Sequence, residues 1–358
     1  MKKKLTVLDL FCGCGGISCG YSLAGFDIIG GIDFNQDAVT TFEANFKKAK
    51  VHCTDITTIT DKAIIEDYNG VDVIVGGPPC QGFSTANRWQ KEMDDPRNRL
   101  FFEYIRFVKL LKPKVIMIEN VRGLLTRDKG YAKERIETIL SGEGYILNMT
   151  VLDASEFGVP QNRKRAIIVG IRKDISSSMF DFGALMRRPG VTVEDAIGEL
   201  YDYENAEDTS VIMLESAPST PYRRYLRSKD NAVYDHEARY PAQIVQERIS
   251  HVPQGGNWSD VPTNLWPNDR KNRHSSAYKR LDPNTQSCTI DTGNAHSNYF
   301  HPLFNRIPSI RESARLQSFP DEFQFTGTRG SKYKQVGNAV PPLLAKAIAD
   351  GIKRILEQ

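Results

Sequence analysis

The sequence predicts an α/β protein in which a doubly wound parallel sheet is joined to a smaller, loop-rich domain. From residue 5 to residue 171, short apolar runs alternate with helix-like segments, which is typical of a parallel sheet covered by helices on both faces. After Arg172 this alternation stops, and Ser, Asn, Pro, Tyr and Arg become frequent. The last segment, PPLLAKAIADGIKRIL, returns to helical spacing, so we expect it to pack back on the first domain.

Five apolar runs are the expected strands, and two segments between them are expected helices. The runs are LTVLDLF (5–11), FDIIGGID (26–33), VDVIVGG (71–77), KVIMIEN (114–120) and RAIIVGI (165–171), and the helices span 36–46 and 100–111. In doubly wound sheets ligands bind outside the carboxyl ends of the strands. Residues 12–16, Asp33, Cys80 and Glu119 stand at the ends of the first four runs, so we expect the site there.

The composition suits a globular protein without a membrane span. The chain has 358 residues, of which 40% are hydrophobic, and it lacks a run of the ~20 apolar residues that a bilayer requires. The start, MKKKLTVLDLF, is interpreted as a first core strand and not as a signal peptide, so we expect a reduced, cytoplasmic protein. Cys12, Cys14 and Cys19 lie close together, but the second pair of ligands that zinc sites usually have does not follow, so no metal is expected.

Charge is unevenly distributed along the predicted second domain. The net charge is only +3, but residues 191–220 contain eight acidic residues and no basic one, whereas residues 221–280 contain eleven Lys or Arg against six Asp or Glu. The basic segment is either a solvated face or a surface that binds a polyanion. Charge alone leaves both interpretations open.

The segment DLFCGCGGIS, residues 9–18, places a glycine-rich turn between the first strand and a helix-like stretch. Glycines at such a turn let the backbone approach a ligand closely, although a tight strand-to-helix turn needs glycine in any case. Asp33 follows at the end of the second run, where a carboxylate can accept both ribose hydroxyls of a nucleoside. The turn and the acid together indicate a nucleoside cofactor. The absence of GxGxxG argues against a nicotinamide dinucleotide.

The segment GGPPCQGFS, residues 76–84, presents Cys80 in a loop stiffened by two prolines. A buried structural thiol is the ordinary interpretation of a cysteine, but a thiolate in such a loop can act as a nucleophile. Glu119 stands at the end of the next run, and Arg163 and Arg165 lie just before the fifth. A thiol, a carboxyl group and two arginines at adjacent strand ends predict a covalent site for a polar substrate.

These motifs together resemble those of the DNA (cytosine-5) methyltransferases, and of bacterial modification enzymes in particular. The resembling segments occur in family order over nearly the whole chain: DLFCGCGG, GGPPCQGFS, ENV, QNRKR, RESARLQSFPDEF and QVGNAVPPLLA. The resemblance is weakest at residues 173–310, where members of the family differ because each recognises a different DNA site.

The resemblance implies a catalytic domain that binds S-adenosylmethionine, formed by residues 1–172 and 331–358, and a target-recognition domain at residues 173–330. It implies that Asp33 binds the ribose, that Asp55 and Ile56 contact the adenine, and that Asn338 holds the methionine end. The other residues implied for the cofactor pocket are Phe11, Gly13, Gly15, Gly16 and Leu100.

The same resemblance implies the chemistry. Cys80 attacks C6 of a flipped cytosine, Glu119 engages N3 and the exocyclic amine, and Arg163 with Arg165 holds the base and its phosphate and favours the thiolate. Residues 84–99 are expected to close over the flipped DNA. The residues expected to contact DNA are Gln81, Ser84, Arg270, Arg273 and Thr289, with Lys279 and Arg280 in the same basic segment.

The implied partner is double-stranded DNA, with a cognate restriction endonuclease encoded nearby, and the implied enzyme is a cytoplasmic, nucleoid-associated monomer. Two alternatives keep the same resemblance. One is a transfer-RNA methyltransferase of the same fold, and the other is a DNA-binding protein with a vestigial catalytic site. The intact GGPPCQGFS and the long recognition region favour the DNA enzyme.

Overall fold

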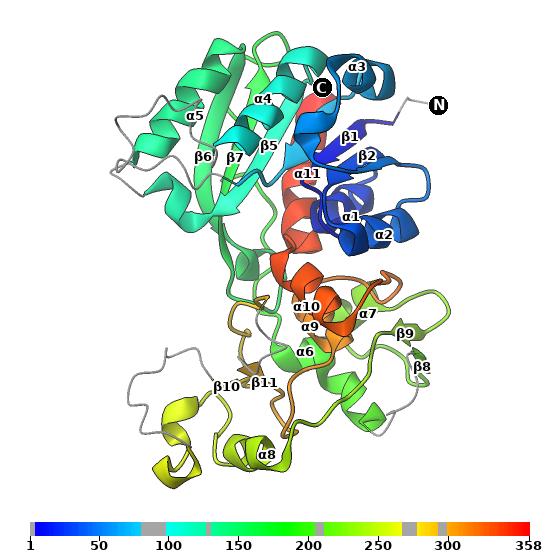
Figure 1. Ribbon diagram of the computed structural model, residues 1–358, viewed down its shortest axis with the longest axis vertical. Helices are drawn as coiled ribbons and strands as arrows, with labels where there is room; N and C mark the ends of the chain where they lie inside the picture. Colours follow the sequence, from blue (N-terminus) through cyan, green and yellow to red (C-terminus); the bar gives the residue numbers. More distant parts are fainter. Residues whose placement is uncertain (1–3, 80–97, 127–129, 205–210, 267–277, 293–298) are drawn as a thin grey trace. The chain divides into compact units, whose positions relative to one another are not determined.

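The computed structural model describes residues 4–79, 98–126, 130–204, 211–266, 278–292 and 299–358 (Figure 1). These residues form two compact units. The first comprises residues 1–157, 164–187 and 340–358, and the second comprises residues 158–163 and 188–339. None of the described helices combines the length and the apolar character needed to cross a membrane.

The first unit is built on a seven-stranded sheet in the order β3-β2-β1-β4-β5-β7-β6. Its strands are β1 (Thr6–Leu10), β2 (Asp27–Asp33), β3 (Lys50–Cys53), β4 (Val73–Gly76), β5 (Val115–Val121), β6 (Tyr145–Asp153) and β7 (Lys164–Arg172). The first five are parallel to one another, and the chain order reverses between β1 and β4. The carboxyl ends of these two strands therefore flank the position where doubly wound sheets bind ligands.

One strand departs from the parallel sheet that the sequence predicted. β7 is antiparallel to both β5 and β6, and Val121 of β5 pairs with Arg165 of β7. The amino end of β7 consequently lies at the edge of the sheet where β5 ends. β3 and β6 were not among the five predicted strands, because neither is a continuous apolar run: each has several partly exposed positions.

Helices cover both faces of the sheet (Figure 1). Side chains of α3 (Asp61–Tyr68), α4 (Arg99–Leu111) and α5 (Tyr131–Gly142) pack on one face, while α1 (Gly16–Leu23), α2 (Gln36–Asn45) and α11 (Pro342–Leu356) lie on the other. The predicted return of the carboxyl-terminal helix to the first domain is confirmed. α11 crosses α1 at Gly20, where a side chain would collide with Ala345 and the Pro342 carbonyl.

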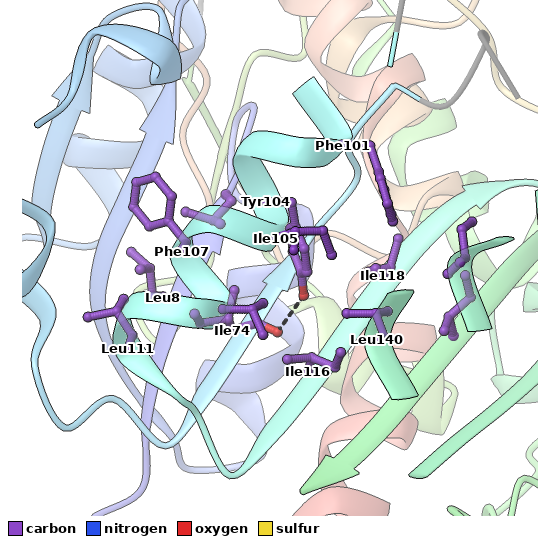
Figure 2. Packing of buried hydrophobic residues seen from close by; sticks show 14 of the residues in the cluster. Leu8, Ile74, Phe101, Tyr104, Ile105, Phe107, Leu111, Ile116, Ile118 and Leu140 are labelled. Carbon is purple, nitrogen blue, oxygen red and sulfur yellow. Dashed lines mark hydrogen bonds between the residues drawn. The ribbon is translucent and has the colours of Figure 1, made fainter. Parts of the chain in front are cut away.

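The core of the first unit joins the sheet to α4 (Figure 2). Leu8, Ile74 and Ile116 face the α4 side chains Phe101, Ile105 and Leu111, and all are buried. Burial of a large aliphatic or aromatic side chain contributes about 1.5–3 kcal/mol. The Tyr104 hydroxyl, a polar group in this layer, donates to the Ile74 carbonyl at 3.1 Å. This packing fixes α4, whose first turn faces the carboxyl edge of the sheet.

The second unit consists of short elements joined by long connections, as the composition predicted. Its elements are α6 (Val193–Ile197), η7 (Gly198–Tyr203), β8 (Val211–Met213), α7 (Pro221–Leu226), β9 (Ala232–Tyr234), α8 (Gln243–Ser250), η8 (Trp258–Asp260), η9 (Thr263–Leu265), β10 (Lys279–Arg280), β11 (Tyr299–Phe300), α9 (Ile310–Leu316) and α10 (Arg329–Asn338). β8 pairs antiparallel with β9, and β10 pairs parallel with β11.

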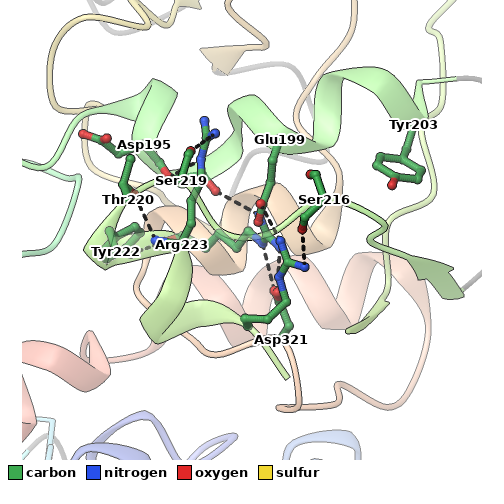
Figure 3. A network of polar contacts seen from close by, with 12 residues as sticks. Asp195, Glu199, Tyr203, Ser216, Ser219, Thr220, Tyr222, Arg223 and Asp321 are labelled. Atoms are coloured by element: carbon green, nitrogen blue, oxygen red, sulfur yellow. Dashed lines mark hydrogen bonds and ion pairs between the residues drawn. The ribbon is translucent and has the colours of Figure 1, made fainter. Parts of the chain in front are cut away.

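Buried ion pairs hold these elements together (Figure 3). Arg315 of α9 is fully buried and donates to both Asp321 oxygens, at 2.8 and 2.6 Å, and to Glu199 at 2.8 Å. Glu199 also accepts from Arg227 at 2.8 Å, and Arg223 pairs with Glu194 at 3.4 Å. Acids of the 191–220 run therefore neutralise arginines of the second unit, and part of the charge asymmetry of the sequence is used internally.

The two compact units divide the chain at other positions than the predicted domain boundaries. Residues 173–187 belong to the first unit, where Phe180 and Leu185 pack against Gly351 of α11 and Asn148 donates to the Phe180 carbonyl at 2.8 Å. Residues 331–339 belong to the second unit, where the Tyr333 hydroxyl donates to the Pro308 carbonyl at 2.7 Å. The functional assignment of the two parts stays a prediction.

Candidate functional site

The glycine-rich turn after β1 adopts backbone conformations that few residues tolerate. Gly13 and Gly15 have φ angles of 52° and 96°, and Phe11 also has a positive φ of 60°. A side chain at Gly15 would come within 2.6 Å of Phe46, whereas the space beside Gly13 is open. A bulky residue at positive φ indicates local strain, which concentrates at ligand sites. The turn therefore combines a fixed backbone with an open surface.

Asp33 lies beside this turn, as the sequence predicted. Its Oδ2 accepts from the Gly13 N–H at 2.9 Å, and its Oδ1 accepts from the Asn35 N–H at 2.9 Å. A carboxylate has about four lone-pair positions, so two backbone bonds orient the group and leave capacity for two ligand hydroxyls. This arrangement fits the ribose of a nucleoside.

The predicted adenine contacts lie at the end of the neighbouring strand. Asp55 caps the short helix η1 (Ile56–Thr58), and its carboxylate accepts from the Thr57 N–H at 2.9 Å. This bond and the positive charge of Arg99 lower the pKa of Asp55 below its usual value, so the group stays ionised. Ile56 is buried, and Leu100 in the first turn of α4 is half-buried.

Two residues that sequence reasoning missed belong to this region. Phe34, which directly follows Asp33, is 79% exposed, and an exposed aromatic ring beside a ribose acceptor can stack on a base. Arg106 of α4 donates to the Ile56 carbonyl at 3.1 Å and to the Ile59 carbonyl at 2.8 Å, and so holds α4 against η1. The sequence could have indicated Phe34, because it directly follows the predicted ribose ligand Asp33. Arg106 had none, because it looks like an ordinary polar position of an amphipathic helix.

Sequence reasoning also missed Asp9 of β1, whose side chain connects the strand before the turn to the helix after it. The side chain is fully buried, and the Ser18 hydroxyl of α1 donates to its Oδ2 at 2.7 Å, which ties β1 to the helix that follows the turn. Its Oδ1 has no partner among the described residues. Burial raises the pKa of Asp9 from 3.8 to about 7, with a smaller contribution from the negative charge of Asp33.

The raised pKa makes the stability of the first unit depend on pH. Between pH ~4 and ~7 the folded protein keeps a proton on Asp9 that the unfolded chain has lost, so the stability decreases as pH rises and levels off above about 7. The whole change is on the order of 4 kcal/mol. Asp9→Asn cannot ionise at this position. We therefore expect its stability relative to the wild type, measured by unfolding in urea, to be higher at pH 8 than at pH 5.

A matched substitution checks the assignment. Ser18→Ala removes the hydroxyl that stabilises the charged carboxylate, so it should move the pH-dependent change to a higher pH and should have no such effect in the Asp9→Asn background. Parallel stability curves for wild type and Asp9→Asn from pH 5 to pH 8 would contradict the assignment.

The chain leaves β4 through the segment that precedes Cys80, and the structure explains both of its glycines. A side chain at Gly76 would collide with the Leu10 carbonyl of β1, and one at Gly77 would approach the Glu119 carboxylate to 3.2 Å. Asn120 donates to the Pro78 carbonyl at 2.8 Å. The segment that follows β4 is thus held in place by contacts with the end of β5.

Glu119 and Arg165 meet at this edge of the sheet. The Arg165 Nε lies 2.9 Å from the Glu119 Oε1, and the two side chains are 17% and 14% exposed. Glu119 lies within β5, two residues before its end, and the antiparallel β7 carries Arg165 to it. The Arg165 guanidinium thus holds a partly buried carboxyl group at the carboxyl edge of the sheet.

Three predicted site residues lie in the second unit. Arg163 is 2% exposed and donates to the backbone carbonyls of Ile290 and Gly337, each at 2.9 Å. Thr289 is exposed, and its hydroxyl donates to the Asn162 carbonyl at 2.8 Å. Asn338 is exposed at the end of α10. The structure therefore places Arg163 and Arg165 in different units.

Five predicted residues lie outside the described residues: Cys80, Gln81, Ser84, Arg270 and Arg273. The same holds for most of the predicted closing loop, residues 84–97. Arg280 is described, but it is buried and donates to four backbone carbonyls, those of Pro302, Ile249, Val252 and Leu303. Arg280, which belongs to the basic segment of the sequence, is therefore engaged within the second unit.

Comparison with known proteins agrees with this geometry. The sequence model of the C-5 cytosine-specific DNA methylase family matches residues 5–354. The chain is 34% identical to the Type II methyltransferase M.DdeI of Desulfomicrobium norvegicum, over 99% of this chain and 89% of that protein. It is 37% identical to the Type II methyltransferase M1.HphI of Haemophilus parahaemolyticus, over 98% and 87%.

A solved structure agrees as well. A prophage-encoded E. coli protein, described as a candidate DNA modification methyltransferase, superimposes with a TM-score of 0.81 at 28% identity, over 99% of this chain and 100% of that chain. The predicted α/β fold is confirmed.

Proposed function

The chain belongs to the C-5 cytosine-specific DNA methylase family, and on this basis we propose that it transfers a methyl group from S-adenosylmethionine to C5 of a flipped cytosine in a specific duplex DNA sequence. The observation that carries the proposal is the Glu119–Arg165 pair, which lies beside the pinned segment that leads to Cys80. These groups suit the activation of a pyrimidine ring by a thiol.

The cofactor would lie along the carboxyl edge between β1 and β3. The Gly13 turn and Asp33 would hold the ribose and the chain attached to it, while Phe34, Ile56 and Leu100 would enclose the adenine. When bound, S-adenosylmethionine supplies the methyl group from its sulfonium. The structure fits this group because the Asp33 carboxylate is fixed and the space beside Gly13 is open. Gly15 and Gly16 would shape the turn, and Asn338 would hold the methionine end.

The chemistry would begin at Cys80. Its thiolate forms a bond to C6 of the cytosine, which makes C5 nucleophilic enough to accept the methyl group. Glu119 would accept a hydrogen bond from the exocyclic amine and, in its protonated form, donate its proton toward N3, so that negative charge on the ring is offset as the adduct forms. Loss of the C5 proton to a base restores the double bond and expels Cys80. Because C6 is unreachable in a duplex, the base must first be flipped out.

The type of substrate and the cellular context follow from the same proposal. Relatives named as Type II methyltransferases support a modification enzyme paired with a restriction endonuclease, and its place of action would be the cytoplasm and nucleoid. Gln81, Ser84, Arg270, Arg273 and Thr289 would contact DNA. Transfer of labelled methyl groups to duplex DNA but not to transfer RNA is expected; the opposite preference would support the transfer-RNA alternative.

An exposed thiol tests the cofactor site directly. Cys53 is exposed, pairs with Asp33 across β2 and β3, and places its sulfur 3.9 Å from the Phe34 carbonyl. A cofactor on Asp33 and Phe34 would cover it. We expect saturating S-adenosylmethionine to slow alkylation of Cys53 about tenfold or more, measured by peptide mass spectrometry in a Cys80→Ser background.

Two controls accompany this measurement. Alkylation of Cys288, a half-buried thiol of the second unit, should be unchanged by the cofactor. Asp33→Asn, which keeps the shape of the side chain but loses its charge, should reduce the protection of Cys53. Equal alkylation of Cys53 with and without saturating cofactor would refute this location of the pocket.

A further inference from the structure

The second unit contains two extended segments that run side by side. Gln161 forms an isolated parallel bridge with Ser287. The Ser287 N–H donates to the Pro160 carbonyl at 2.9 Å, and the Asn162 N–H donates to the Ser287 carbonyl at 3.0 Å. Burial alternates along the first segment, where Gln161 and Arg163 are buried and Asn162 is exposed. In the second segment Ser287 and Ile290 are buried and Thr289 is exposed.

The buried side chains of the first segment hold the backbone of the second. The Ile290 N–H donates to the Gln161 Oε1 at 2.9 Å, and the Ile290 carbonyl accepts from the Arg163 guanidinium at 2.9 Å. Both polar groups of one backbone residue are thus bound by side chains from a single tripeptide. Thr289, directly before Ile290, is fixed as well, because its hydroxyl donates to the Asn162 carbonyl.

The same two side chains are anchored in the rest of the unit. The Gln161 amide donates to the Leu316 carbonyl at 3.2 Å and to the Gln317 Oε1 at 3.0 Å, and Gln317 in turn donates to the Val336 carbonyl at 2.7 Å. Arg163 also donates to the Gly337 carbonyl. Gly337 packs so closely on Asp291 and Thr292 that a side chain there would collide with their backbone. Three distant segments, at residues 161–163, 316–317 and 336–337, therefore meet at the backbone that carries Thr289.

We propose that Gln161 and Arg163 are positioning residues that fix Thr289, together with the exposed Asn162, as a surface for DNA recognition. Arg163 acts through the Ile290 backbone and does not touch the reacting cytosine, unlike Arg165. The geometry supports this division of roles, because a guanidinium that is 2% exposed and bound to two carbonyls cannot reach a ligand without giving up those bonds. The inference rests on the proposed function for its DNA ligand.

The contacts of Gln161 and Arg163 with the Ile290 backbone can be tested without DNA. Gln161→Met keeps the length of the side chain but removes the acceptor of the Ile290 N–H. Hydrogen exchange of peptides covering residues 286–292, followed by mass spectrometry, is expected to be about tenfold faster in this variant than in the wild type. Arg280→Lys is the matched control, because Arg280 is another buried arginine of the second unit that donates only to backbone carbonyls in the described structure. Its effect should fall on other peptides.

The role in recognition is tested with Arg163→Lys, which keeps the charge but loses the planar fork of donors. We expect the affinity for duplex DNA that contains the recognised sequence to fall about tenfold or more, while the affinity for unrelated duplex DNA is nearly unchanged. The affinity for S-adenosylmethionine should stay within about threefold of the wild type, and the loss in affinity for the recognised DNA should exceed any loss in the methylation rate at saturating DNA.

A milder variant keeps the proposal testable if Arg163→Lys does not fold. Thr289→Val removes one exposed hydroxyl and should weaken binding of the recognised sequence, whereas Thr285→Val, at another exposed threonine of the same segment, should not. If Arg163 acts through Thr289, the two substitutions should not add. The double variant Arg163→Lys/Thr289→Val should then bind the recognised sequence with about the same affinity as the single variant that binds it less tightly.

Other outcomes would overturn the proposal. Loss of about a hundredfold in the rate at saturating DNA with unchanged affinity would assign Arg163 to the reacting base. Unchanged hydrogen exchange of residues 286–292 in Gln161→Met would show that Gln161 does not hold the Ile290 backbone in place. Failure of the proposed function is distinguishable, because the wild type itself would then neither bind nor methylate DNA, whereas the exchange measurement needs no DNA.

Discussion

Replacing Cys80 with serine is expected to reduce methyl transfer to DNA by at least about 10³-fold, because a serine hydroxyl is a much weaker nucleophile than a thiolate at neutral pH. The measurement is a single-turnover assay with labelled S-adenosylmethionine and saturating DNA. The structure supplies the reason for the position: Gly76, Gly77 and Pro78 are packed against β1 and β5, so the chain that leads to Cys80 starts from a fixed point.

Two controls separate loss of the nucleophile from loss of the fold. The Cys80→Ser protein should still show protection of Cys53 by the cofactor, since Cys53 lies at the other side of the β1–β4 reversal. DNA carrying 5-fluorocytosine at the target should form a stable adduct with the wild type only, because fluorine cannot leave C5 as the proton does. Transfer by Cys80→Ser within tenfold of the wild type would exclude covalent catalysis by this residue.

Glu119→Gln is expected to have the second-largest effect, a loss of about 10²- to 10³-fold in the rate at saturating DNA. The amide keeps the shape of the side chain but removes the carboxyl group that is proposed to donate a proton toward N3 of the cytosine. It also leaves Arg165, which is 17% exposed, without its described carboxylate partner. The loss should therefore be accompanied by a modest decrease in thermal stability.

Asp72→Asn is the matched control for Glu119→Gln. Asp72 is an 11% exposed carboxylate paired with Lys114 at 2.8 Å, but it lies where β4 and β5 begin, at the opposite edge of the sheet. This variant should lose stability while its methylation rate stays near that of the wild type. A Glu119→Gln rate within threefold of the wild type would show that Glu119 only supports the structure.

The sequence could predict the site where local patterns determine it. The glycine turn, Asp33 and the exit to Cys80 follow apolar runs that formed β1, β2 and β4 nearly as expected. The apolar period also located α2, α4 and α11, because each buries one continuous stripe of side chains. In these parts local pattern and tertiary packing agree.

The sequence could not predict the direction of β7, which decides the chemistry. In a parallel strand, Arg165 would lie at the edge opposite to Glu119. The antiparallel pairing with β5 and β6 brings the two residues to 2.9 Å. Strand direction depends on pairing across distant segments, and an apolar run contains no signal for it.

Two other features were hidden for similar reasons. Arg163 and Arg165 are two positions apart and look equivalent in QNRKR, but one is buried against carbonyls of the second unit and the other pairs with Glu119 in the first. Basic residues between 221 and 280 suggested a surface, yet Arg223, Arg227 and Arg280 are engaged within the second unit. Charge patterns do not show which partner is inside the fold.

The central claim, methylation of cytosine C5 through Cys80, is tested most directly by bisulfite sequencing of host DNA after expression of the wild type and of Cys80→Ser. We predict that 5-methylcytosine occurs in one short sequence context in cells with the wild type and is absent in cells with the variant. Equal patterns in both, or no 5-methylcytosine in DNA from cells that contain folded wild-type protein, would contradict the claim.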